Sequence, residues 1–413
     1  MHSSYRLNVL LMDFGVSSSF WLIFASLMTY VYEATHSIFL LSTLILIKNL
    51  VLAIILLLFN YINLRSYFGN LMNIAYFVLI LTILFIILYN PINNIILIFI
   101  LFILFETVFM IHNILKYNVV IFLDYKKVEF VNLMYELSSS IFMILGSIYA
   151  ILFVKISIST YLLTLVLIIL SFIFFNKINL NNNIQFDGSN AIFENSFSKL
   201  LLLLLIADFL IAVGENAVYI ILPSIANFYV YNSEQGYSIS LLLFGLGSLI
   251  ANMCLLSKPK LIIKKHFWIL VYAMYSLFPA SLIFSINVEN HSKLIFILGN
   301  ISAGFANSFL MLFFTSFYQR IGKEEFRKIY GIAYLLISIA SSISTLTVGL
   351  LYENLGIFNT LFLSTVLLIS TMPLLVLLNR HYHRLVIEDI KYEEINKLKA
   401  NLNIRKNIDF KRI

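Results

Sequence analysis

NKINLNNNIQFDGSNAIFENSFS, residues 176–198, is the longest internal polar stretch of this 413-residue chain. It is rich in Asn and Ser and poor in apolar side chains, a composition typical of a flexible connection. Apolar runs of about 20 residues recur on both sides of it, and each is long enough for an α-helix to cross a bilayer. We predict six such spans before the stretch and six after it, centred near Ala25, Lys48, Leu81, Phe105, Phe142, Thr164, Ile211, Leu246, Ser276, Ser308, Ser341 and Leu368.

The composition excludes a water-soluble protein. Hydrophobic residues make up 61% of the chain and charged residues only 11%, whereas soluble domains carry roughly 25% charged residues. The apolar runs are solid Leu, Ile and Phe without the alternating polarity of barrel strands, so the spans are predicted to be helices. The first span follows the N-terminus without a small-residue cleavage site, which predicts that it is retained. Cys254 is the only cysteine, so no disulfide framework is expected.

The basic residues give the expected topology. If the N-terminus is cytoplasmic, all but three of the 27 Lys and Arg residues fall on cytoplasmic segments, the exceptions being Lys48, Lys155 and Lys293. This is the asymmetry of the positive-inside rule. We therefore expect a multi-pass protein of the cell membrane, with both termini cytoplasmic. Its predicted parts are a first half at residues 1–175, a cytoplasmic linker at 176–198, a second half at 199–379 and a basic cytoplasmic tail at 380–413, which either lies on anionic lipid or is solvated.

Carboxylates inside the predicted spans are the main candidates for a functional site. Each costs about 2.5 to 3.5 kcal/mol on insertion scales and usually faces a bundle interior or a water-filled cavity. Glu106 lies near the middle of the fourth span and shares a helical face with Asn113. A buried ion pair between Lys48 and Glu106 is the structural alternative. Glu136 is closer to a span end, which favours a structural role for it.

The second half has two further polar stripes. Asp208 and Glu215 are two helical turns apart on the seventh span, and Asn216 adjoins them. Asn300 and Asn307 lie on one face of the tenth span. The predicted substrate and proton pathway therefore consists of Glu106, Asn113, Asp208, Glu215, Asn216, Asn300 and Asn307.

Several landmarks along the chain resemble the major facilitator superfamily, and in particular its multidrug, macrolide-efflux and siderophore-exporter branch. They are YEATHS at 32–37 after the first span, Asn132 fourteen residues before Gly146, ILPSIA at 221–226, and GLLYENLG at 349–356 between the last two spans. The resemblance covers nearly the whole chain. It implies an all-α integral membrane protein of twelve transmembrane helices in two six-helix halves, the major facilitator fold.

Other landmarks of that branch are altered. The loop after the second span is NYINLR at 60–65, without the Gly and acid of the family pattern, and GSIYA at 146–150 replaces the antiporter motif Gly-Pro-x-x-Gly. The fourth span has no Arg within its membrane part. Proton coupling is thus implied by the resemblance and by the buried carboxylates, while the antiporter motif itself is missing.

The function predicted from the sequence is secondary active transport by alternating access, with proton-coupled export of a small amphipathic compound such as a drug, siderophore or peptide-like molecule. The alternatives are an importer on the same fold and a transport-inactive immunity, sensor or scaffold protein. No phosphate-binding loop or zinc-protease motif is present in the sequence, so an enzyme is not expected. The expected partners are a small-molecule substrate, protons and the lipid bilayer, with no nucleic acid, cofactor or metal, and the expected state is a monomer.

Overall fold

The structure is a computed structural model in which every regular element of the described residues is a helix. The description covers residues 2–35, 37–61, 64–89, 100, 103–106, 109, 112, 128–152, 158–177, 195–229, 236–258, 265–287, 292–322 and 326–409.

The first half contributes long apolar helices, each of which contains one of the predicted span centres. Between α3 and α5, residues 103–106 and the single positions 109 and 112 are helical, at the place of the predicted fourth span. The named helices of this half are α1 (His2–Thr35), α2 (Ile38–Tyr61), α3 (Leu64–Tyr89), α5 (Val128–Leu152) and α6 (Ile158–Asn176).

Two places in the second half depart from a simple one-helix pattern. The predicted ninth span is split at Leu277, two residues before Pro279, which has no backbone N–H for a helical hydrogen bond. The predicted eleventh and twelfth spans are both part of α12, in which two helices meet at a kink at Gly356, with a φ of 76°. The helices are α7 (Asn195–Tyr229), α8 (Gly236–Ser257), α9 (Lys265–Ser276), α10 (Phe278–Asn287), α11 (Ser292–Gly322) and α12 (Phe326–Asp409).

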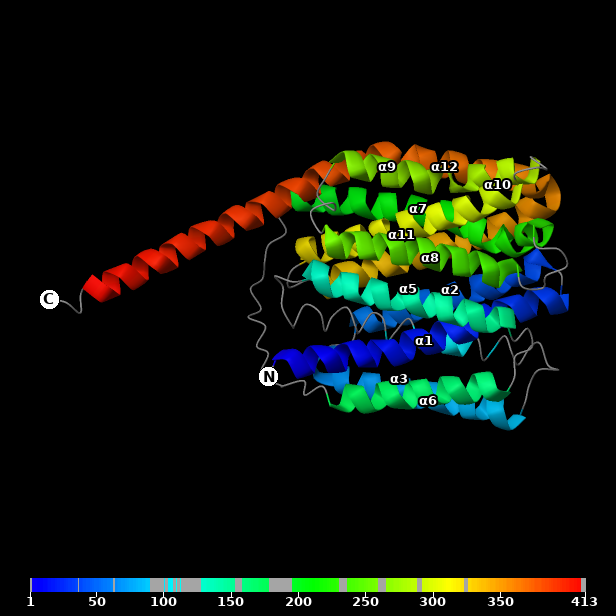
Figure 1. Cartoon of the computed structure of the whole chain (residues 1–413), viewed down its shortest axis with the longest axis horizontal. Helices are drawn as coiled ribbons and strands as arrows, with labels where there is room; N and C mark the ends of the chain where they lie inside the picture. The colour runs from blue at the N-terminus through cyan, green and yellow to red at the C-terminus, as the bar shows by residue number, and fades with distance from the viewer. Residues whose placement is uncertain are drawn as a thin grey trace.

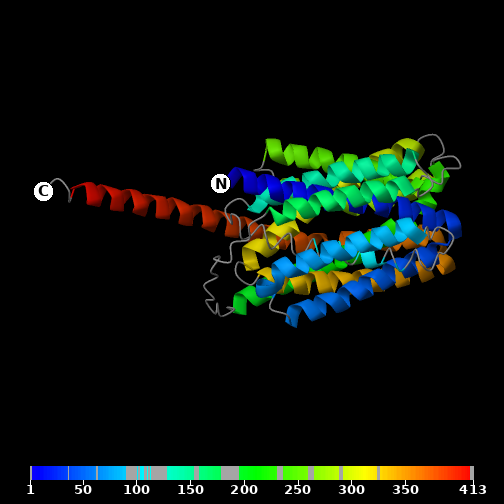
Figure 2. The same cartoon turned by 90° about the horizontal axis from the view of Figure 1, so that it is seen from below.

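The helices run along a common axis, with the second half on one side and the first half on the other (Figure 1). Within the first half α1 packs against α5 and α6, and within the second half α12 packs against α7 and α9. The halves are joined mainly where α5 meets α8 and α11 and where α2 meets α12, and less extensively where α1 meets α8 and α2 meets α7. Both termini emerge at one end of the bundle, and the last part of α12 extends well beyond that end (Figures 1 and 2).

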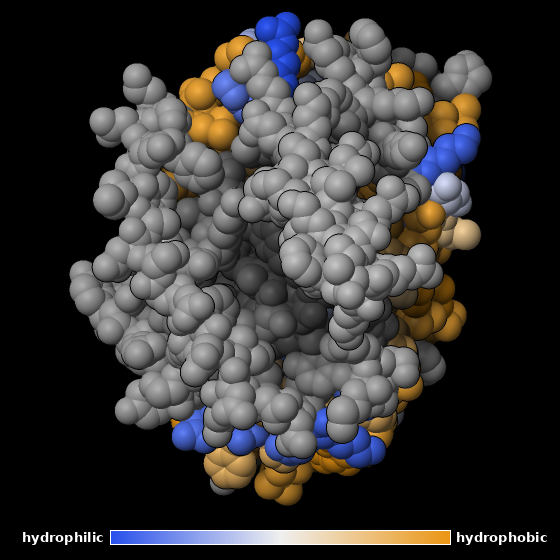
Figure 3. Space-filling view, turned by 90° about the vertical axis from the view of Figure 1, so that its left-hand side faces the viewer, coloured by the Kyte–Doolittle hydropathy of each residue, from blue (hydrophilic) through white to orange (hydrophobic). Residues whose placement is uncertain are grey.

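The outer surface suits a bilayer. Large apolar side chains face outward, including Leu88 at 77% exposure and Leu152 at 69%, and hydrophobic atoms cover much of the described surface at the flanks in Figure 3. Seven stretches of the described helices are long and apolar enough to cross a membrane, and the last of them, Leu335–His381, has 47 residues. At 1.5 Å per residue it measures about 70 Å, enough for two crossings. The predicted helical membrane fold is confirmed, and the division into residues 1–175, 176–198, 199–379 and 380–413 stays a prediction.

Candidate substrate and proton pathway

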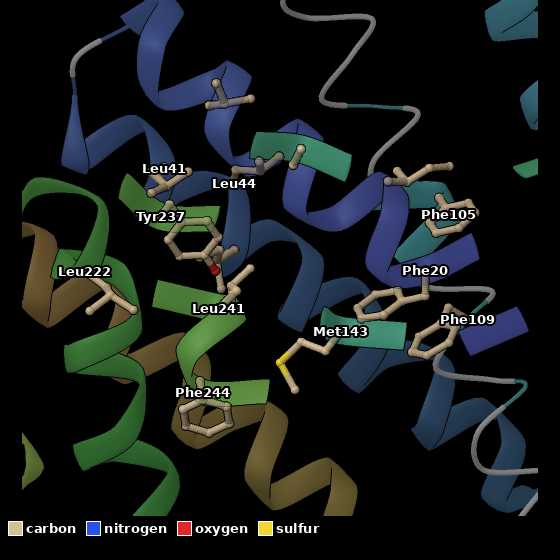
Figure 4. Close-up of a cluster of buried hydrophobic side chains, with 14 of the residues drawn as sticks. Phe20, Leu41, Leu44, Phe105, Phe109, Met143, Leu222, Tyr237, Leu241 and Phe244 are labelled. Carbon is tan, nitrogen blue, oxygen red and sulfur yellow. The ribbon is translucent and has the colours of Figure 1, made fainter. Parts of the chain in front are cut away.

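Glu106 lies deep in the first half among aromatic rings. Its side chain is 1% exposed, and its helical neighbours Phe105 and Phe109 are also buried. Phe109 stacks on Phe20 of α1, with ring centroids 3.8 Å apart and planes 8° from parallel (Figure 4). Phe105 and Phe109 belong to the same buried cluster as Tyr237 of α8, so the surroundings of this acid reach the other half.

The rings around Glu106 continue from one half to the other. Phe20 stacks on Phe24, with centroids 5.3 Å apart, and Phe24 lies 6.4 Å from the ring of Tyr237. Trp21 donates a hydrogen bond from Nε1 to Ser139 Oγ of α5, at 3.1 Å. Figure 4 shows Phe20, Phe109 and Tyr237 within one buried cluster that includes side chains from both halves.

A second buried polar group lies entirely within the first half. The hydroxyl of Tyr76 on α3 is 3.1 Å from His112 Nε2 and 2.7 Å from Ser171 Oγ on α6. Ser171 donates to the carbonyl oxygen of Met12 on α1. The next residue, Asp13, is 0% exposed and accepts a hydrogen bond from Ser17 Oγ at 3.2 Å. These contacts connect α1, α3, α6 and the fourth span through side chains that can carry or pass a proton.

This network was not predicted from the sequence. Neither Asp13 nor Tyr76 is among the predicted pathway residues, and His112 has the position of a span-end residue. Asp13 stands at the beginning of an apolar run, where an acid is ordinarily accessible to the interface. Tyr76 is one of 24 tyrosines. The available signal was the combination of an acid, a tyrosine and a histidine in three spans of one half, and spacing along the chain does not reveal which of them meet.

Asp208 of α7 is hydrogen-bonded to a tyrosine of the second half. Tyr318 of α11 donates a hydrogen bond to Asp208 Oδ2 at 2.9 Å. Glu215 lies two turns further along the same helix, α7. Both acids are partly buried. Asp208 adjoins Ala207, which belongs to a second-half packing cluster different from the one around Glu106, so the predicted acids occupy two regions rather than one group.

The predicted stripe on the tenth span proves to be mainly a helix-crossing surface. Asn300 is 0% exposed and donates from Nδ2 to the carbonyl of Phe296, whereas its Oδ1 has no hydrogen-bond partner among the described residues. Asn307 is partly buried. Between them, a side chain at Gly304 would collide with the backbone oxygen of Phe244, so glycine allows α8 and α11 to cross closely.

A compact hydroxyl cluster joins the halves at the contact of α5 with α8 and α11. Ser140 of α5 is hydrogen-bonded to Ser248 of α8, with the two Oγ atoms 2.6 Å apart, and Ser248 bonds to Ser308 of α11. Asn252 donates from Nδ2 to Ser140 at 3.0 Å and to Ser308 at 3.4 Å. All four residues are buried. The halves are therefore held together by neutral hydrogen bonds at this contact.

Three predicted residues cannot be placed. Asn113 lies outside the described residues, as do the side chains of Asn216 and Lys48. The pairing of Lys48 with Glu106 consequently stays a prediction. Within the described part of the chain, no group of three or more His, Cys, Asp or Glu side chains is arranged to hold a metal ion.

The arrangement of the two halves, which meet where α5 contacts α8 and where α2 contacts α12, is similar in overall fold to solved transporters, one of which is described as a major facilitator superfamily transporter. Among solved structures, the human organic anion transporter MFSD10 (TETRAN) superposes with a TM-score of 0.66 at 12% sequence identity, over 91% of this chain and 99% of that chain. The E. coli fucose:proton symporter FucP superposes with a TM-score of 0.57 at 14% identity, over 92% of this chain and 99% of that chain.

A further structure of FucP, in the outward conformation, matches with a TM-score of 0.59 at 14% identity, over 92% of this chain and 99% of that chain. No protein-family model and no curated protein sequence matches this chain. At these identities the likeness establishes the fold, and the predicted multidrug branch stays a prediction.

Proposed function

We propose that this chain is a secondary active transporter that works by alternating access and exports a small amphipathic compound in exchange for protons. The observation that carries the proposal is the burial of Glu106 next to Phe105, in a cluster of buried side chains that includes residues of both halves. A carboxylate is costly inside a membrane protein and is typically retained where it binds an ion or a substrate. A protonated acid is neutral and a deprotonated one attracts cations, so one group can exchange a proton for a substrate.

Asp208 and Glu215 are the proposed second-half members of the pathway. Asp208 is hydrogen-bonded to Tyr318, a neutral donor, which is compatible with a change of protonation state. The buried Asp13–Ser17 pair and the Tyr76 network add a first-half group that is connected to the same helix, α1, as Phe20 and Phe24. These groups give each half at least one acid that can take part in coupling.

The test is substrate efflux from proteoliposomes driven by an imposed proton gradient. The purified chain is compared with Glu106→Gln, Asp208→Asn and Glu215→Gln, each of which removes a charge with little change of shape. We expect loss of gradient-driven efflux in at least one variant that still exchanges substrate at equilibrium. Unchanged coupling in all three would refute the proposed proton pathway.

An importer is the second candidate, because the similar fold of FucP belongs to a protein described as a fucose:proton symporter. The two directions are separated in intact cells that express the chain. Loss of a preloaded substrate supports export, and gradient-dependent accumulation supports import.

A further inference from the structure

Two serine hydroxyls of α12 bind consecutive backbone oxygens in the middle of α7. Ser344 Oγ donates to the carbonyl oxygen of Val213 at 2.7 Å. Ser364 Oγ donates to that of Gly214, also at 2.7 Å. Both serines are buried. They come from opposite sides of the kink at Gly356, so the predicted eleventh and twelfth spans hold the same point of α7.

These two bonds restrain the rotation of α7 about its own axis. A carbonyl oxygen has two lone pairs, so it can accept a hydroxyl in addition to the helical N–H. Successive residues of an α-helix are turned by about 100°, so the two carbonyl oxygens lie on different sides of the axis. Bonds from two neighbours therefore oppose rotation in either sense. Gly214 keeps α7 close to the twelfth span, because an added Cβ there would lie 2.8 Å from the side chain of Leu368.

The residue directly after the two held carbonyls is an acid, Glu215, which is partly buried. A carboxylate about 6 Å from the helix axis would move by about 2 Å if α7 turned by about 20°. Each serine has one hydroxyl proton, and the backbone of α7 accepts it. The serines therefore act on the acid through the backbone.

The first half contains a similar arrangement. Ser171 of α6 donates to the carbonyl oxygen of Met12, and the next residue along α1 is the buried Asp13. The crossing of the two helices is marked by Gly15, which lies against Leu167 and Ser171. In this half the serine is the second of the two crossing positions, and the acid comes before the glycine.

In the second half the serine and the acid have both changed ends of the crossing. Gly214 lies against Ser364 and Leu368, so the serine is the first of the two positions, and Glu215 comes after the glycine. A serine that served only the packing of the helices would be expected at the same position in both halves, as the glycines are. The serine instead follows the acid.

We infer that Ser344 and Ser364 are positioning residues that hold the Glu215 carboxylate at a fixed place in the proposed pathway. This inference rests on the proposed transport function, which assigns Glu215 to that pathway. It adds a part of the site that touches neither the substrate nor the proton. The two spans of α12 determine where the acid lies, and α7 supplies the acid.

The mobility of a nitroxide attached at Glu215→Cys tests the restraint on the purified full-length chain without any gradient. The background is Cys254→Ser, which removes the only native cysteine. We expect the label to be mostly immobile in this background. Ser344→Ala and Ser364→Ala should each raise the ratio of mobile to immobile label by about 3- to 10-fold, the effect of losing one hydrogen bond. If one serine variant fails to fold, the other still tests the inference.

Thr347→Ala and Ser370→Ala are the matched controls. Each removes a hydroxyl from one of the same two spans, and these hydroxyls donate within α12, to the carbonyl oxygens of Ile343 and Leu367. They should leave the mobility ratio unchanged. A nitroxide at Glu136→Cys on α5 reports any general loosening of the bundle, and it should not respond to the serine variants.

Gradient-driven efflux from proteoliposomes, with norfloxacin as the transported probe, connects the restraint to transport. With Glu215 retained, each serine variant should lower the rate by about 3- to 10-fold. Unchanged mobility in the serine variants, or an equal rise at Glu136→Cys, would overturn the inference. Raised mobility with a full rate of efflux would overturn it as well. Absence of gradient-driven efflux by the unmodified chain would count against the proposed function alone and leave the mobility result in place.

Discussion

The two halves use a tyrosine at the same structural position but surround it differently. In the first half Tyr76 of the third span bonds to Ser171 of the sixth, and in the second half Tyr272 of the ninth bonds to the carbonyl of Leu368 in the twelfth. Tyr76 also bonds to His112. Tyr272 donates to a backbone oxygen, whereas the hydroxyl of Tyr76 is bonded to two side chains.

The same comparison holds for the close crossing of the first and last helices of each half. Gly15 lies against Leu167 and Ser171, and Gly214 lies against Ser364 and Leu368. Repeated halves of this fold thus keep the packing contacts of their helices. The polar groups differ, because the first half joins its tyrosine to a histidine while the second half bonds Asp208 to Tyr318 on a different pair of helices. The two halves are therefore more alike in the packing of their helices than in their buried polar side chains.

A covalent cross-link between the two halves should have the largest effect, which we expect on transport. We expect Ser140→Cys with Ser248→Cys, in a Cys254→Ser background, to form a disulfide across α5 and α8, because the native Oγ atoms are only 2.6 Å apart. The oxidised protein should lose all transport in proteoliposomes, and a reductant should restore it. Each single-cysteine variant, oxidised in the same way, is the control. Full transport by the cross-linked protein would show that the halves need not separate at this contact.

The glycine crossings should differ in how much they tolerate a methyl group. At Gly15 an added Cβ would meet the backbone oxygen of Leu167, which cannot move freely, whereas at Gly214 it would meet side-chain atoms of Leu368 at 2.8 Å. We expect Gly15→Ala to destabilise the protein by roughly 3 kcal/mol and Gly214→Ala by about 1 kcal/mol. Unfolding in mixed micelles, followed by circular dichroism, measures both. Equal losses of unfolding free energy in the two variants would contradict the different contacts described for Gly15 and Gly214.

Removal of the tyrosine hydroxyls should have the next largest effect on the free energy of unfolding. Tyr76→Phe deprives His112 Nε2 of its bonded hydroxyl inside the bundle and is expected to cost roughly 2 kcal/mol. Tyr272→Phe should cost about 0.5 to 1 kcal/mol, because the Leu368 carbonyl still accepts from Thr371. The same unfolding assay compares the two. A larger loss for Tyr272→Phe would reverse the proposed contrast between the halves.

An effect as small as that of Gly214→Ala is expected for the coupling of Asp208 to Tyr318. The bond is partly buried, so we expect an interaction free energy of about 1 kcal/mol from a cycle of Asp208→Asn, Tyr318→Phe and the double variant. Ser17→Ala serves as the first-half counterpart, since Ser17 bonds to the fully buried Asp13. Additive losses in the cycle would mean that Asp208 is stabilised mainly by other groups.

Much of the fold was accessible from the sequence because membrane spans are read from local composition. The apolar runs and the polar stretch at 176–198 were sufficient to predict two sets of helices. The split at Leu277 and the kink within α12 depend on local backbone geometry around Pro279 and Gly356, which apolar content does not report.

The candidate site was less accessible, because it depends on contacts between helices far apart in the chain. Helical spacing predicted that Asp208 and Glu215 share one face of a helix, and it could not identify Tyr318, 110 residues away, as a partner of Asp208. The Tyr76–His112–Ser171 group likewise unites three spans with no shared motif. In a chain with 38 phenylalanines, the rings around Glu106 carried no signal until their stacking was known.

The helix α12 continues to Asp409, so its last part lies outside the bundle and moves with the last span. Beyond His381 the helix continues for about 40 Å, so a tilt of about 10° in the last span would move its far end by about 7 Å if the helix stays straight. A spin label or fluorophore placed near that end would thus magnify a small reorientation of the second half into a displacement that spectroscopy resolves. The tail is a suitable site for a spectroscopic probe of the proposed transport cycle, because it is far from every residue proposed to bind substrate.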